Sequence, residues 1–185
     1  MSETGLRGEF GMVTEPGTVR MERLLPGPVE RVWAYLTEPD KRALWLAGGP
    51  MLLEVGGAVE LHFDHARLSH EPTPEQYRSK RADGIHLHHG RVTGCEPPRV
   101  LAYTWDEGAE RRESEVCFEL SPAGAGTRLV LTHRRLAGAK QMISVASGWD
   151  THLDLMEDRL AGREPIGFWT AYFAFEKEYQ RRVGG

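Results

Sequence analysis

The stretch G-R-V-T-G-C-E-P-P-R-V-L-A-Y-T-W (residues 90–105) decides the fold of this chain. Its two consecutive prolines lack backbone N–H groups and hold φ at about −65°, so a β-ladder must break there between two strands. After this corner, Leu101, Tyr103 and Trp105 fall on one face, because side chains alternate along a strand. A strand that presents Tyr and Trp to one side needs a helix or a cavity opposite it, since a single sheet cannot bury that area against itself.

Other segments of the chain share this alternation and predict an antiparallel sheet of about six to seven strands. The predicted strands are residues 18–25, 51–55, 58–65, 85–95, 99–106, 113–120 and 127–134, with a further short strand at 10–14. The Gly56-Gly57 dipeptide accepts the positive φ values of a tight hairpin. Turns are also expected at Glu107-Gly108 and over residues 121–126, so the last four strands form a meander.

Helical periodicity appears in four places. Two short helices are predicted after the first full strand, one from Pro28 to about Leu36 and one over residues 39–45. A long helix from about Gln141 to Leu160 is the element that can cover the aromatic face of the meander. A last helix, over residues 165–182, carries two adjoining aromatic stripes, which predict packing on the open face of this domain or a contact in a homodimer.

The predicted organisation is therefore a single α+β domain over residues 16–162. Residues 1–15 are expected to be flexible or to form a short strand, and residues 163–185 to form a helical extension rich in aromatic residues. The polar segment 66–84 is long for a loop inside a compact domain, which predicts that it is mobile or acts as a lid.

Composition narrows the functional class. The chain has 185 residues and a formal net charge of −4, without a run of Lys and Arg that could follow a phosphate backbone, so nucleic acid is not an expected partner. The sequence contains no apolar run of about 18 residues, so a membrane is not an expected partner. Cys95 and Cys117 lie outside any metal-ligand spacing and suit a reducing compartment, so a cytoplasmic protein without a cofactor is expected.

Three stretches, residues 20–40, 90–105 and 148–162, resemble the signature regions of the bacterial homologues of the activator of the ninety-kilodalton heat-shock chaperone's ATPase, within the START/SRPBCC superfamily. The resemblance covers about residues 16–182. It implies a helix-grip fold, in which a curved sheet wraps the long C-terminal helix, and a cavity between sheet and helix that often holds an apolar ligand. It supplies no invariant catalytic residues. The eukaryotic activators contact the chaperone largely through an additional N-terminal domain, for which this sequence is expected to have no room.

The histidines are the sharpest local signal. His86 and His88 share a strand face with Val92, and His133 shares one with other apolar residues of its strand, so all three are candidates to point into the concave side of the sheet. Three inward imidazoles would suit a metal site or the polar end of a ligand pocket. A bulge near Gly90 would instead turn the first two to solvent.

Three functions remain open at this point. The first is non-catalytic binding of a small hydrophobic or amphipathic molecule, lined by Trp33, Trp45, Phe63, His88, Tyr103, Trp105, Phe118, His133, Trp149 and Leu153. The second is a cyclase-like or dehydratase-like enzyme with a pocket histidine as general base, and the third is an interaction module or chaperone partner. No catalytic residue or metal ligand is assigned. The acidic residues Asp106, Glu107, Glu110, Glu113 and Glu115 are expected to form a solvated rim.

Overall fold

A computed structural model of the chain describes residues 10–105 and 113–183. The strands are β1 (Met12–Glu15), β2 (Thr18–Pro26), β3 (Ala58–Phe63), β4 (His86–Glu96), β5 (Val100–Trp105), β6 (Ser114–Ala123) and β7 (Gly126–Arg134). The helices are α1 (Val29–Thr37), α2 (Pro39–Arg42), α3 (Gly138–Leu160) and α4 (Phe168–Val183), with short 3₁₀ helices at His65–Arg67 and Glu75–Tyr77.

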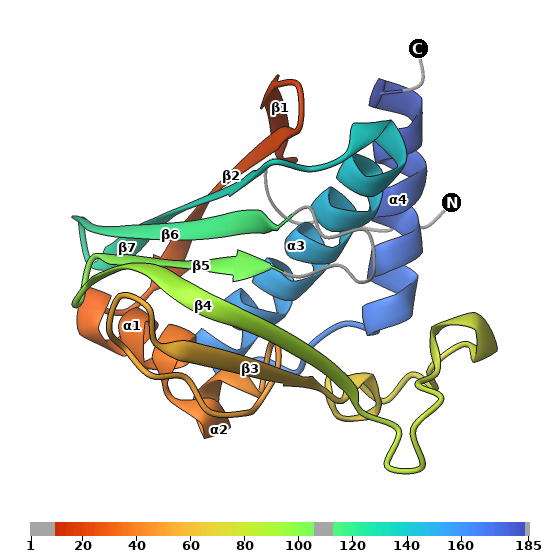
Figure 1. The fold of residues 1–185 in the computed structure, drawn as a ribbon, viewed down its shortest axis with the longest axis horizontal. Coiled ribbons are helices and arrows are strands. Elements are labelled where there is room, and N and C mark those ends of the chain that lie inside the picture. The colour runs from red at the N-terminus through yellow and green to blue at the C-terminus, as the bar shows by residue number, and fades with distance from the viewer. Residues whose placement is uncertain (1–9, 106–112, 184–185) are drawn as a thin grey trace.

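All seven strands form one antiparallel sheet in the order β1-β2-β7-β6-β5-β4-β3. The sheet curves around α3, and α4 lies along α3 on the side away from the sheet (Figure 1). The predicted α+β helix-grip fold is confirmed, together with the two short helices after the first full strand and the extra helix at the C-terminal end.

The corner at Pro97-Pro98 separates β4 from β5 as predicted, and the peptide bond between the two prolines is cis. Leu101 and Tyr103 are 0% and 1% exposed, because they lie on the concave face under α3. The register of β4 shifts between Val92 and Gly94, C-terminal to its histidines. Because this bulge lies beyond the histidines, His86, His88 and Val92 stay on one face; Val92 is buried and His88 half-buried, whereas His86, at the start of the strand, is exposed to solvent.

The predicted strand at residues 51–55 is absent. Only an isolated bridge joins Met51 to Val59, and the chain then turns back so that the Gly57 N–H donates a hydrogen bond to the Glu54 carbonyl. The Leu52 carbonyl approaches Gly57 so closely that a Cβ at position 57 would lie 2.2 Å from its oxygen. The apolar residues that suggested a strand are exposed in this tight loop, because no neighbouring strand continues the ladder past Met51.

Two predicted boundaries also change. The turn expected over residues 121–126 shortens to Gly124-Ala125, because β6 and β7 pair as far as Ala123 and Gly126. The second short helix ends at Arg42 rather than near residue 45, since the buried Arg42 guanidinium donates hydrogen bonds to the carbonyls of Thr37, Ala47 and Gly49 and folds the chain around itself. The expectations for residues 1–8, the Glu107-Gly108 turn, Asp106 and Glu110 lie outside the described residues.

A buried ionic cluster joins β2, α3 and α4. The Arg23 guanidinium lies 2.6 Å from Asp150, which also accepts a 2.5 Å hydrogen bond from the Tyr179 hydroxyl of α4. Asp154 lies 3.7 Å from the same guanidinium, and its carboxylate oxygens accept no hydrogen bond from the described residues. Arg23 thus lies much closer to Asp150 than to Asp154. Because Asp154 is buried without a close partner, its pKa is raised to about 7.

This inequality predicts opposite effects for two amide substitutions. Asp154 keeps its proton in the folded state up to pH about 7 but loses it near 4 in the unfolded chain, so its contribution to stability falls as pH rises between these values. We expect Asp154→Asn to match wild type near pH 4 and to exceed it at pH 8 by on the order of 1 kcal/mol in free energy of unfolding. Urea titrations at both pH values measure this difference.

Asp150→Asn is the matched control for this substitution. It removes the carboxylate that binds both Arg23 and Tyr179, so it should lower the free energy of unfolding by about 3 kcal/mol at pH 8. Equal losses of stability in the two variants would show that the two carboxylates share the arginine evenly.

Candidate functional site

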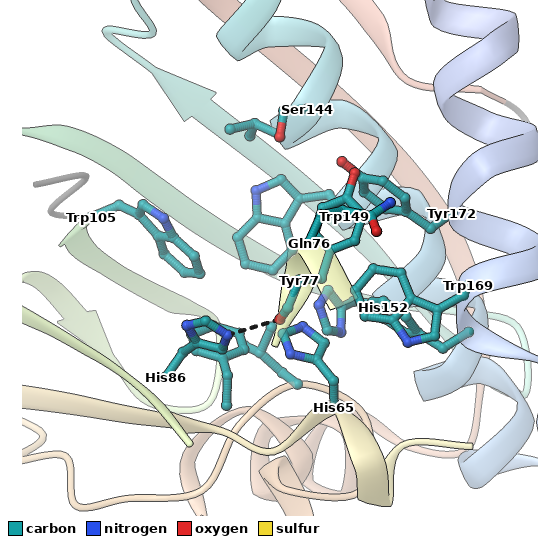
Figure 2. A pocket seen from close by; sticks show the side chains of 15 residues that line it. His65, Gln76, Tyr77, His86, Trp105, Ser144, Trp149, His152, Trp169 and Tyr172 are labelled. Atoms are coloured by element: carbon teal, nitrogen blue, oxygen red, sulfur yellow. Dashed lines mark hydrogen bonds between the residues drawn. The ribbon is translucent and has the colours of Figure 1, made fainter. Parts of the chain in front are cut away.

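A cavity of about 350 Å³ lies between the sheet, α3, α4 and the segment that joins β3 to β4. This volume is at the small end of the range for ligand pockets, which is roughly 300–1,000 Å³. The lining consists of Leu46, Phe63, His65, Gln76, Tyr77, His86, Trp105, Ser144, Val145, Gly148, Trp149, His152, Phe168, Trp169 and Tyr172. Figure 2 shows the polar and aromatic members of this set around a common space.

The wall formed by the sheet and α3 is fixed by a chain of hydrogen bonds. The Trp149 indole N–H donates to His133 Nδ1 at 2.9 Å. An indole N–H can only donate, so neutral His133 carries its proton on Nε2, and this group donates to Ser114 Oγ at 2.8 Å. The Ser114 hydroxyl in turn donates to the Trp105 carbonyl. This series of hydrogen bonds links Trp149 to Trp105, whose ring centroids lie 5.2 Å apart at the cavity.

His133 is therefore a buried, neutral, fully hydrogen-bonded histidine. It is 0% exposed, and burial lowers its pKa to about 3. Both ring nitrogens are already occupied, and the residue lies behind Trp149 rather than in the cavity lining. This arrangement makes His133 a positioning residue for the two tryptophans and gives it no free nitrogen with which to act as a general base.

Three other histidines line the cavity: His65, His86 and His152. The His152 Nδ1–H donates to the Trp45 carbonyl at 2.6 Å, because a carbonyl only accepts, and this fixes the other ring nitrogen as an acceptor. Burial lowers the pKa of His152 to about 3 and that of His65 to about 4, so both rings are uncharged at neutral pH. His65 and His152 therefore provide hydrogen-bonding capacity without charge.

The opposite wall comes from α4 and from the segment predicted as a mobile stretch or a lid. Tyr77 of this segment stacks on Trp169 of α4, with ring centroids 4.6 Å apart. The Glu71 carboxylate accepts hydrogen bonds from the backbone N–H and the hydroxyl of Thr170, and Ser69 Oγ accepts one from the Phe168 N–H. Ser69 and Glu71 therefore cap the N-terminus of α4 and anchor the segment there. Only residues that follow this anchor, such as Gln76 and Tyr77, cover the cavity.

The structure separates the ten predicted lining residues into two groups. Phe63, Trp105 and Trp149 line the cavity. His88 lies just behind it, with its ring 4.6 Å from that of Trp105. The others pack in the core or on its margin, outside the lining set: Trp33, Trp45, Tyr103, Phe118, His133 and Leu153.

Several lining residues were not predicted as such. Phe168, Trp169 and Tyr172 belong to α4, whose stripes predicted packing but not a cavity wall, and α4 packs on α3 of its own chain. Tyr77 comes from the polar segment, where local pattern gives no inward face, and His65 lies at the end of the predicted strand 58–65, which in the structure stops at Phe63 and continues as a 3₁₀ helix. One signal was available in the sequence: Gly148 falls inside the pattern of the long helix, where a glycine costs roughly 1 kcal/mol relative to alanine and indicates a packing or functional reason.

The described residues provide neither a metal site nor a membrane-spanning helix. Within residues 10–105 and 113–183, no three His, Cys, Asp or Glu side chains come together in a way that could hold a metal ion. None of the helices in the described part of the chain has the length and apolar character needed to cross a bilayer.

A curved antiparallel sheet around a long helix, with an aromatic cavity between them, defines the class of helix-grip domains. The profile of the family described as "Activator of Hsp90 ATPase homolog 1-like protein" matches residues 26–161, and the chain belongs to this family. No curated protein matches the chain.

Solved structures agree with this assignment. The protein encoded by gene BPP1335 from Bordetella parapertussis is 45% identical, with a TM-score of 0.78 over 98% of this chain and 95% of that one. CalU16 from Micromonospora echinospora is 21% identical and has a TM-score of 0.64 over 95% of this chain and 96% of that one, which is a likeness of fold.

The hydrogen bonds predict opposite tautomers for two histidines. His133 should carry its proton on Nε2 and His152 on Nδ1, and both should stay neutral between pH 8 and pH 5 because burial lowers each pKa to about 3. Long-range ¹H–¹⁵N correlation spectra of the imidazole rings report both properties. A charged ring at pH 6, or the same tautomer in both residues, would contradict the hydrogen-bond chain.

Proposed function

We propose that this protein binds a small molecule with an uncharged, hydrophobic body in the cavity between β5, α3 and α4. The observation that carries the proposal is the aromatic cavity of about 350 Å³, closed on one side by Trp105 and Trp149 and on the other by Tyr77 and Trp169. Such surfaces bury apolar area and pack against flat or aliphatic groups. The family commonly binds hydrophobic ligands, which supports the proposal.

The charge of the cavity supports an uncharged occupant. Among the described residues that line it, none is Asp, Glu, Lys or Arg; burial keeps His65 and His152 neutral at neutral pH, and the third lining histidine, His86, lies at the exposed side of the cavity. A buried charge without a partner is costly, so a charged group inside this cavity would be rejected. The part of the ligand that enters must therefore be neutral.

The cavity has few hydrogen-bonding groups, and their role in this proposal is to orient the ligand. His152 offers an acceptor, because its Nδ1–H is used by the Trp45 carbonyl, and the side chains of Ser144, Tyr172 and Gln76 add polar atoms at the edge. A ligand with one hydrogen-bond donor near His152 would satisfy the site. Binding, and not catalysis, is the function that this arrangement supports best, since no nucleophile with an adjacent base lines the cavity among the described residues.

Gly148 provides a test that fills the cavity without disturbing the fold. It lies on α3 at the cavity, and a Cβ built there meets no atom within 4 Å. We expect Gly148→Leu to preserve or raise the melting temperature, because leucine favours helix over glycine, and to weaken binding of the neutral probe N-phenyl-1-naphthylamine at least tenfold. Probe fluorescence and thermal unfolding measure the two effects.

Gly148→Ala is the matched control, since it makes the same change in helix propensity but occupies little of the cavity. It should bind the probe within about threefold of wild type, a difference of less than 1 kcal/mol. Failure of the wild-type protein to bind the probe, or equal binding by the leucine variant, would refute binding in this cavity.

A further inference from the structure

A second hollow of about 430 Å³ adjoins the aromatic cavity. Its lining includes Asp64, Thr73, Arg78, Ser79 and Asp83, all from the segment between β3 and β4 or its edges. Three residues, His65, Tyr77 and His86, line both spaces, so the two hollows are the two sides of one wall. We call the first the inner cavity and the second the outer hollow.

The wall between them is formed by side chains that line both spaces, and the contacts of its backbone are few. The His86 ring nitrogen Nε2 lies 3.0 Å from the Tyr77 carbonyl, and this contact is exposed. Tyr77 itself belongs to a 3₁₀ helix of three residues, Glu75–Tyr77, that pairs with no strand. The anchor at Glu71 holds the start of the segment on α4; after Thr73, the Tyr77 ring stacks on Trp169, while the hydrogen bonds of the backbone are local. Displacement of one ring would join the two hollows.

The two sides of the wall differ in charge. The inner cavity has no Asp, Glu, Lys or Arg among its described lining residues, whereas the outer hollow has two carboxylates and one guanidinium. Each carboxylate already has an arginine partner: Asp64 lies 3.4 Å from Arg67, and Asp83 lies 2.9 Å from Arg81.

Arg78 is the guanidinium of the outer hollow. Its Nε–H donates to the Thr73 carbonyl at 2.9 Å, which holds the side chain over the hollow. Within the described residues it forms no ion pair, so its remaining N–H donors are available to an acidic group.

We propose that the outer hollow is the second half of the ligand site and that Arg78 binds the acidic end of an amphiphile whose apolar body occupies the inner cavity. This inference rests on the proposed function and names the class of ligand: an apolar body joined by a flexible chain to a carboxylate or a similar anion. The wall at Tyr77 and His86 is the position that the chain of such a ligand crosses.

The test compares two fluorescent probes that differ only in the charge at one end, 11-(dansylamino)undecanoic acid and its methyl ester. The wild-type protein should bind the acid roughly fivefold more tightly than the ester, which corresponds to one partly exposed charge-assisted contact. Arg78→Gln should abolish this preference without changing the affinity for the ester. Lys80→Gln is the matched control, because it removes the same charge from an exposed side chain of the same segment that does not line the hollow.

The outcomes separate this inference from the proposed function. Equal affinity for acid and ester, equal effects of the two substitutions, or no binding of either probe by a protein that binds N-phenyl-1-naphthylamine would overturn the role of Arg78 and leave the inner cavity as the ligand site. Loss of all binding, including that of the small neutral probe, would instead refute the proposed function.

Discussion

The hydrogen bond from the Trp149 indole to His133 Nδ1 is the interaction on which the rest of this molecule depends. It joins the long helix to the concave face of the sheet, fixes the tautomer of His133 and, through Ser114, reaches the backbone of Trp105. Because these groups are buried, a lost partner would leave an unsatisfied polar atom in the core. The same bond holds Trp149 beside Trp105 at the cavity, so one interaction contributes both to the fold and to the proposed binding site.

A curved sheet around one helix leaves space that the side chains of these two elements do not fill, and the C-terminal part of the chain closes that space here. Phe168, Trp169 and Tyr172 of α4 line the cavity, while Tyr77 from the segment between β3 and β4 stacks on Trp169. The two walls of the cavity thus differ in how they are held. The wall with Trp105 and Trp149 is built on the sheet and α3, whereas the wall with Tyr77 depends on the capped start of α4 and a short 3₁₀ helix. In the proposed function, a ligand enters and leaves on the second side.

The fold could be predicted to a large extent from the sequence because the decisive patterns are local. Alternation around Tyr103 and Trp105 and the period of the long helix each reflect one element burying one face. The site was harder to predict, since which buried aromatic residues leave a gap depends on how separate elements meet. Trp33 and Trp105 look equally suitable in the sequence, yet only Trp105 lines the cavity, and Tyr77 gives no signal because its segment has no periodicity. The strand predicted at residues 51–55 was wrong for a similar reason. Apolar residues such as Val55 suggested a strand, but whether a neighbouring strand is there to pair with them depends on the tertiary structure.

The five tryptophans allow the most direct test of a ligand site between the sheet, α3 and α4. Trp105, Trp149 and Trp169 line the cavity, whereas Trp33 and Trp45 lie outside it. In ¹H–¹⁵N spectra of the indole N–H groups, titration with a small neutral aromatic ligand should shift the signals of the first three and leave the other two in place. Shifts confined to Trp33 or Trp45, or no shift in any of the five at saturating ligand, would contradict a binding site between the sheet, α3 and α4.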